Sequence, residues 1–77
     1  MTTTIYSTPT CPFCKQVKAF FDEKGVEYTD IDVMHDQEKA AEMIHKSGQM
    51  GVPVIDIDGE IVVGFDQKRL KELLKIE

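Results

Sequence analysis

Residues 11–14, Cys11-Pro12-Phe13-Cys14, contain both cysteines of this 77-residue chain. They follow a run rich in β-branched and aromatic residues, Thr3–Ser7, and stand at the start of a helical pattern. At a helix N-terminus, unpaired backbone N–H groups and the helix dipole stabilise a thiolate, and a thiol one turn later can attack a mixed disulfide. Pro12 suits the first helical position because its missing N–H has no helical partner there. The spacing therefore indicates a dithiol–disulfide redox centre.

Two other uses of such a cysteine pair are a structural zinc site and a structural disulfide. Zinc commonly takes a second cysteine pair or two closely spaced histidines, but His35 and His45 lie ten residues apart. A disulfide that closes so short a loop stabilises a fold by only about 2 kcal/mol. Redox chemistry fits better, and we expect no metal site and no bound cofactor.

The composition favours one domain over residues 1–77, because 42% of the residues are apolar and 30% are charged with interspersed signs. The net charge of −5 repels nucleic acid and anionic membranes. No apolar run approaches the roughly 20 residues of a membrane span, and the N-terminus lacks a signal core. A lone CxxC pair in a reducing compartment is more often catalytic than structural. We therefore expect a cytoplasmic protein, and a monomer.

The chain alternates strand-like and helical patterns. The turn residues Asp58-Gly59 predict an antiparallel hairpin, and the first β-α-β unit predicts parallel pairing. In the second helix we expect Ala40, Ala41 and Ile44 to face inward, with Met43 beside them. The order β-α-β-α-β-β-α predicts an α/β fold with a four-stranded mixed sheet flanked by three helices. The expected strands are Thr3–Ser7, one within Glu27–Val33, Pro53–Ile57 and Glu60–Val63, and the expected helices are Pro12–Lys24, one from the cap Asp36 to Lys46, and one from the cap Asp66 to Lys75.

Three segments together resemble the glutaredoxin family of the thioredoxin fold. They are Thr8-Pro9-Thr10-Cys11-Pro12-Phe13-Cys14, then Gly51-Val52-Pro53-Val54, then Gly64-Phe65-Asp66. The resemblance covers nearly the whole chain and implies a thioredoxin-like fold. It also implies a thiol–disulfide oxidoreductase that reduces protein or small-molecule disulfides.

The resemblance implies a role for each matching residue. Cys11 is expected to be the nucleophile, exposed to substrate, and Cys14 the less accessible resolving thiol. Pro53 is expected to follow a cis peptide bond and to pack beside the dithiol. Val52 is expected to offer its backbone N–H and C=O to an extended substrate. The alternative is a purely structural role, in which Pro53 only starts an edge strand.

Glutathione is the co-substrate that the resemblance implies, and the chain departs from the family's pattern for holding it. Thr8 stands where a basic residue is usual, Phe13 stands where Tyr is usual, and Val63 and Gln67 replace one Gly and one Asp. Lost charge-assisted hydrogen bonds cost about 1.5–3 kcal/mol each, so we expect weak binding. The expected substrate or glutathione contacts are Thr8, Phe13, Gln16, Val52, Pro53, Phe65 and Asp66.

Three alternative functions stay open. Glutaredoxin-like redoxins accept electrons from thioredoxin reductase, a flavoprotein, and some donate them to ribonucleotide reductase. Some glutaredoxins instead carry an iron–sulfur cluster between two monomers, although these usually have Gly or Ser where this chain has Pro12. A protein that uses the fold only to bind a partner would give no turnover with a small disulfide.

Overall fold

The computed structural model describes residues 2–76, which form four strands and three helices. Their order confirms the predicted β-α-β-α-β-β-α arrangement, although several ends differ from the expected ones by a few residues. Pro53 precedes its strand instead of starting it. Within the described residues, no helix has the length and apolar character needed to cross a membrane. The elements are β1 (Thr3–Ser7), α1 (Pro12–Lys24), β2 (Thr29–Asp32), α2 (Gln37–Ser47), β3 (Val54–Ile57), β4 (Glu60–Val63) and α3 (Gln67–Leu74).

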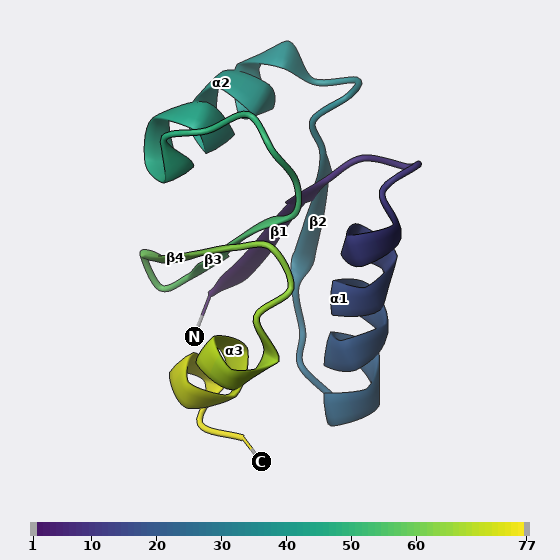
Figure 1. The fold of residues 1–77 in the computed structure, drawn as a ribbon, viewed down its shortest axis with the longest axis vertical. Helices are drawn as coiled ribbons and strands as arrows, with labels where there is room; N and C mark the ends of the chain where they lie inside the picture. Colours follow the sequence, from purple (N-terminus) through teal and green to yellow (C-terminus); the bar gives the residue numbers. More distant parts are fainter. Residues whose placement is uncertain (1, 77) are drawn as a thin grey trace.

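The four strands form one mixed sheet in the order β2-β1-β3-β4 (Figure 1). β1 pairs in parallel with β2 and antiparallel with β3, and the β3–β4 hairpin is antiparallel. Tyr6 of β1 thus lies between Ile31 of β2 and Val54 of β3. Because β1 is central, its carboxyl end delivers the chain to the start of α1 from the middle of the sheet.

The helices cover both faces of the sheet, with α1 and α3 on one face and α2 on the other (Figure 1). Successive residues of β1 point to opposite faces, as the pleat of a strand requires. Ile5 packs with Phe21 of α1 and Leu70 of α3, whereas Tyr6 packs with Met43 of α2. The result is a three-layer α/β fold with a core on each side of the sheet.

A side chain caps the N-terminus of each helix. Asp36 accepts a hydrogen bond from the Lys39 N–H, and Asp66 accepts one from the Arg69 N–H, each at 3.1 Å. In α1 the cap is a cysteine, Cys11. A carboxylate at this position satisfies one unpaired N–H of the first turn and stabilises the helix. In α1 a sulfur takes this place and accepts the Cys14 N–H.

The inward face of α2 differs from the expected one. Met43 is buried, but Ala41 is exposed and 37% of the Ile44 surface is accessible. The stripe that faces the sheet runs through Ala40 and Met43. Ala41 and Ile44 each follow a residue of that stripe, and one residue turns an α-helix by about 100°. The expectation that Ala41 and Ile44 face inward is therefore wrong.

Candidate redox site

The redox motif lies at the carboxyl end of the central strand. β1 ends at Ser7, and the loop that follows is closed by a 3.3 Å hydrogen bond from the Cys11 N–H to the Thr8 carbonyl oxygen. α1 then begins at Pro12, the position where a missing N–H costs nothing. Open α/β sheets place their sites at the carboxyl ends of strands, and this loop follows that rule.

The two thiols lie in different environments. The Cys14 backbone N–H donates to Cys11 Sγ over 3.2 Å, and the Cys11 thiol lies 3.9 Å from the Val52 carbonyl oxygen. Cys14 has no accessible surface, and Cys11 retains 9% of its surface. The expected order of accessibility is therefore confirmed, but the expectation of an exposed Cys11 is wrong. Val52, from the segment before β3, contacts the thiol of this largely buried cysteine.

The pKa of Cys14 is displaced upward. Burial is the largest cause, followed by the hydrogen bond with Cys11, and together they raise the pKa of the Cys14 thiol from 9.0 to about 12. A hydrogen bond from the Thr8 backbone and the charge of Lys18 act in the opposite direction. In the reduced protein Cys14 therefore keeps its proton at neutral pH.

The fold brings the three family-like segments together. The Val52–Pro53 peptide bond is cis, as predicted, and Pro53 is buried. The Pro53 carbonyl oxygen accepts a 2.9 Å hydrogen bond from the Gly64 N–H. This bond joins the loop before β3 to the loop after β4, while Val52 contacts Cys11 on its other side. Segments that are about 40 and 50 residues from the dithiol in sequence thus border it in space.

Two of the expected contact residues have side chains engaged elsewhere. The Phe65 ring packs edge-on against the Phe20 ring, with centroids 5.8 Å apart, and belongs to the core beneath α1 and α3. The Asp66 carboxylate caps α3 through the Arg69 N–H. The structure therefore gives the Phe65 ring a packing role and the Asp66 carboxylate a capping role.

Of the other expected substrate contacts, two lie at the redox motif and one lies on the face of α1 opposite Cys14. Thr8 adjoins Cys11 through its backbone, and the Phe13 side chain, 57% exposed, projects from the first turn of α1. Gln16 is exposed two residues after Cys14, about 200° around the helix from the buried thiol. The helix geometry therefore separates Gln16 from the face that carries Cys14.

A polar cluster next to the dithiol was not expected from the sequence. The Lys18 ammonium of α1 lies 2.7 Å from an Asp30 carboxylate oxygen of β2, and the Ser7 hydroxyl donates to the other oxygen over 2.7 Å. The i, i+4 spacing of Cys14 and Lys18 on one helix was the only feature of the sequence that indicated Lys18 lies near the dithiol. Asp30 could not be added from the sequence, because its place beside Ile5 depends on the register of β1 and β2.

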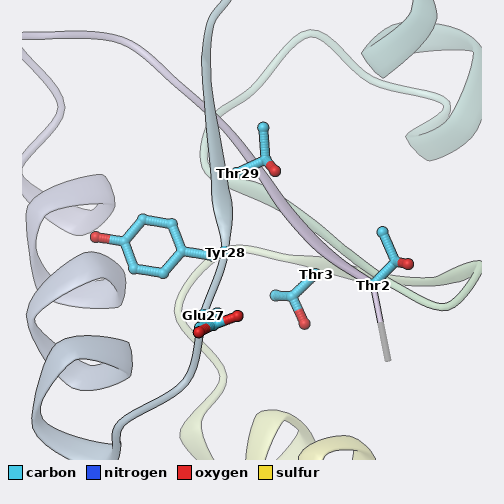
Figure 2. A pocket seen from close by; sticks show the side chains of 5 residues that line it. All are labelled: Thr2, Thr3, Glu27, Tyr28 and Thr29. Atoms are coloured by element: carbon cyan, nitrogen blue, oxygen red, sulfur yellow. The ribbon is translucent and has the colours of Figure 1, made fainter.

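A hollow of about 270 Å³ lies away from the dithiol, at the amino ends of β1 and β2 (Figure 2). Its lining is mostly polar, and the Tyr28 side chain points from it toward α1. The cysteines lie beyond the opposite end of β1, so this hollow is not part of the redox site. The lining residues are Thr2, Thr3, Glu27, Tyr28 and Thr29.

Comparison with known proteins agrees with the observed fold. A family model described as Glutaredoxin matches residues 3–62. A relative from Clostridium pasteurianum, "Uncharacterized glutaredoxin-like 8.6 kDa protein in rubredoxin operon", is 45% identical over 71 residues, which are 92% of this chain and 95% of the relative.

Solved structures with the same fold include thioredoxin-like and glutaredoxin proteins. The thioredoxin-like protein BC3987 is 32% identical with a TM-score of 0.86, and the match covers 92% of this chain and 97% of that one. A buckwheat glutaredoxin–glutathione complex is 27% identical with a TM-score of 0.75, and the match covers 91% of this chain and 66% of that one. These matches confirm the thioredoxin-like fold and support an activity of the thiol–disulfide oxidoreductase type. By its sequence, its fold and the convergence of its three motif segments, this chain belongs to the glutaredoxin family.

Proposed function

We propose that the protein is a dithiol oxidoreductase in which Cys11 attacks substrate disulfides and Cys14 resolves the mixed disulfide. One observation carries this assignment. At the start of α1, Cys11 Sγ accepts the Cys14 backbone N–H over 3.2 Å, whereas the Cys14 thiol is fully buried. A hydrogen bond to sulfur at a helix N-terminus favours the thiolate, which is the reactive form. Burial favours the neutral thiol instead.

The reaction has two exchange steps. In the first, the Cys11 thiolate attacks one sulfur of the substrate disulfide, that S–S bond breaks, and the departing thiolate takes up a proton. In the second, Cys14 loses its proton and attacks Cys11 Sγ, which releases the second substrate thiol. The substrate gains two electrons and two protons, and the protein is left with a Cys11–Cys14 disulfide.

The surroundings of Cys11 support an extended substrate. The Val52 backbone adjoins the Cys11 sulfur, and a peptide laid along it would add a short strand beside the loop. Two exposed apolar side chains, Phe13 (57%) and Met50 (79%), project from the segments on either side. They offer apolar contact to a protein or peptide that carries the disulfide.

Glutathione is the electron donor that we propose, with weak affinity. The likeness to the buckwheat glutaredoxin–glutathione complex supports it. Thr8 offers no charge to a glutathione carboxylate, and the Asp66 carboxylate already caps α3. A flavoprotein reductase of the thioredoxin reductase type is the competing donor. We place the activity in a reducing cytoplasm, because a lone cysteine pair with this spacing is more often catalytic than structural there.

Trapping with Cys14→Ser tests the thiol assignment. The variant should form a stable mixed disulfide with a disulfide-containing peptide, located at Cys11 by mass spectrometry of the digested adduct. Cys11→Ser is the matched control and should trap nothing. An adduct at Cys14 in the control, or unimpaired turnover of Cys14→Ser on protein disulfides, would sink the dithiol mechanism.

Coupled assays test the donor. NADPH oxidation is followed once with glutathione and glutathione reductase and once with thioredoxin reductase, using the same protein disulfide. Turnover at millimolar glutathione with none through the flavoprotein supports the proposal. Turnover through thioredoxin reductase with none from glutathione would instead identify a glutaredoxin-like redoxin, one of the alternatives that the sequence left open.

A further inference from the structure

In the second exchange step the buried Cys14 thiol must lose its proton, and the two cysteines alone do not favour that ionisation. Cys14 is fully buried, and its pKa is raised to about 12, first by burial and then by its hydrogen bond with Cys11. Once Cys11 is held in a mixed disulfide, it carries no charge and no longer opposes ionisation of Cys14. Burial remains, and it still favours the neutral thiol. Prompt release of substrate therefore requires a neighbouring group that stabilises the Cys14 thiolate.

Lys18 is placed to be that group. It follows Cys14 by four residues in α1, so the two side chains lie on the same face on consecutive turns. Its ammonium is held by Asp30 Oδ2 of β2 at 2.7 Å, and Asp30 Oδ1 accepts the Ser7 hydroxyl of β1 at 2.7 Å. Ser7 is only 2% exposed, so the residue that holds Asp30, and through it Lys18, is a buried part of the sheet.

The charges around Lys18 keep it cationic. Burial lowers the pKa of Lys18, but the hydrogen bond and charge of Asp30 outweigh it, and the net shift is upward. The other facing group is Tyr28, which precedes β2 and donates to Asp22 of α1 over 3.2 Å. Burial and the Asp22 charge raise the pKa of Tyr28, so this phenol stays neutral at working pH. The Lys18 charge in turn lowers the pKa of Cys14.

We propose that Lys18, held in place by Asp30 and Ser7, is a positioning residue for the second exchange step, where its ammonium stabilises the Cys14 thiolate that attacks the mixed disulfide at Cys11. This inference rests on the proposed role of Cys14 as the resolving thiol. Lys18 gives up no proton in the step. The proton that Cys14 loses is balanced by the one that the departing substrate thiolate takes up, while the Cys11–substrate bond breaks and the Cys11–Cys14 bond forms.

The competing reading is an ordinary ion pair that ties α1 to β2. Such partly exposed pairs contribute about 0–1 kcal/mol to stability. A purely structural pair would affect both exchange steps alike or neither of them. A charge that acts on Cys14 affects only the second step, and it does so with a pH dependence.

Stopped-flow reaction of the reduced protein with dithiodipyridine separates the two steps. This disulfide is uncharged, so Lys18 does not attract it, and each step releases one coloured thiopyridone. The first phase reports attack by Cys11 and the second reports resolution by Cys14. The rates are measured across the pH range for wild type, Lys18→Met, Lys18→Arg and Lys15→Met. Lys15 is an exposed lysine of the same helix and serves as the matched control.

Lys18→Met should leave the first phase unchanged and slow the second about tenfold at neutral pH, with its midpoint moved up by about one pH unit. Lys18→Arg should restore most of the second-phase rate, and Lys15→Met should match wild type in both phases. Unfolding midpoints establish that each variant is folded, and the arginine variant keeps the test decisive if the methionine variant is unstable. A second phase in Lys18→Met that matches Lys15→Met at every pH, or equal slowing of both phases, would overturn the proposal. Absence of the first phase from every protein would instead refute the proposed thiol assignment.

Discussion

The two faces of the sheet each carry a lysine that reaches from a helix to an aspartate on a strand. On the α1 face, Lys18 meets Asp30 at 2.7 Å, and on the α2 face, Lys46 meets Asp56 at 2.8 Å. Lys46 also donates to the Tyr6 hydroxyl over 3.0 Å and lies 5.4 Å from the centre of its ring. The same lysine–aspartate contact thus occurs twice, with different neighbours.

The neighbours decide what each contact does. The Tyr6 hydroxyl donates to Glu42 of α2 over 2.8 Å, so the network on that face links α2 to β1 and β3. Hydrogen bonds to Asp56 and Tyr6 raise the pKa of Lys46 above its usual value, which keeps it charged in the folded protein. On the α1 face, Lys18 lies one turn after Cys14, and its charge acts on that buried thiol. A helix-to-strand ion pair therefore stabilises packing on one face and adjoins a reactive group on the other.

The largest expected effect concerns the thiol on the α1 face. Burial and the hydrogen bond with Cys11 raise the pKa of Cys14 from 9.0 to about 12. At neutral pH this shift lowers the thiolate fraction by at least about a hundredfold, and alkylation requires the thiolate. Iodoacetamide labelling with peptide mapping should show Cys14 reacting at least about a hundredfold more slowly in the folded protein than in urea. Labelling of Cys14 before Cys11 in the folded protein would contradict the assignment.

On the α2 face, a substitution should change stability and leave the chemistry intact. Lys46→Met keeps the aliphatic length but leaves Asp56 and Tyr6 without their shared donor. We expect a loss of about 1–2 kcal/mol in the free energy of unfolding, measured in urea. Both phases of the dithiodipyridine reaction should stay at wild-type rates.

Lys39→Met is the matched control for that change, since Lys39 lies on the same helix and its contact with Glu42 is a looser 3.5 Å. Its expected cost is below about 0.5 kcal/mol. Equal losses in the two variants would remove the distinction between the network and an ordinary surface pair.

A smaller effect should follow from adding a charge beside the dithiol. Thr8→Lys supplies the cation that the family usually has at this position and that a glutathione carboxylate can bind. One such contact is worth about 1.5 kcal/mol at the low end of the range for charge-assisted hydrogen bonds, so the apparent KM for glutathione should fall about tenfold. The rate of Cys11 attack on dithiodipyridine should stay unchanged because that substrate is neutral. A wild-type protein that already saturates at micromolar glutathione, with no gain in the variant, would show that Thr8 does not limit binding.

The smallest effect is the acid sensitivity of the α2 face. Burial raises the pKa of Asp56, but the hydrogen bonds from Lys46 and the Gly59 N–H outweigh it, so the folded value lies below the usual 3.8. Stability from a depressed carboxyl pKa is present above the unfolded value and is lost as pH falls through the folded value. Below about pH 4, the free energy of unfolding should fall less steeply in Asp56→Asn than in wild type, by under about 1 kcal/mol in total. Identical slopes would exclude Asp56 as a source of acid sensitivity.

Patterns among residues close in sequence were sufficient to predict much of this architecture. The apolar face of α1, the turn at Asp58-Gly59 and the capping aspartates Asp36 and Asp66 each depend on residues a few positions apart. The same is true of the dithiol, because Cys11 and Cys14 are brought together by the first turn of α1. Interactions over such short spans are encoded in the sequence directly, and the structure confirms them.

Two local expectations about burial were wrong because burial is decided by what packs on a segment. Ile44 is as apolar as a core residue, yet it lies beside the stripe of α2 that meets the sheet. Cys11 stands at the start of a helix, yet only 9% of its surface is accessible, and its thiol contacts the Val52 carbonyl oxygen. Val52 lies about 40 residues further along the chain, where no helical periodicity could indicate the contact.

By itself, the sequence determined the order of strands and helices, the position of the two thiols at the start of α1, and the likeness to the glutaredoxin family, because each is carried by neighbouring residues. Tertiary structure alone decided which strands lie side by side and therefore which charges meet. The parallel register of β1 and β2 places Asp30 beside Ile5 and within reach of both Ser7 and Lys18. A one-residue shift of that register would turn Asp30 to the other face of the sheet, because side chains alternate along a strand. The surroundings of Cys14 thus depend on strand pairing, a long-range choice that is settled only when the whole sheet forms.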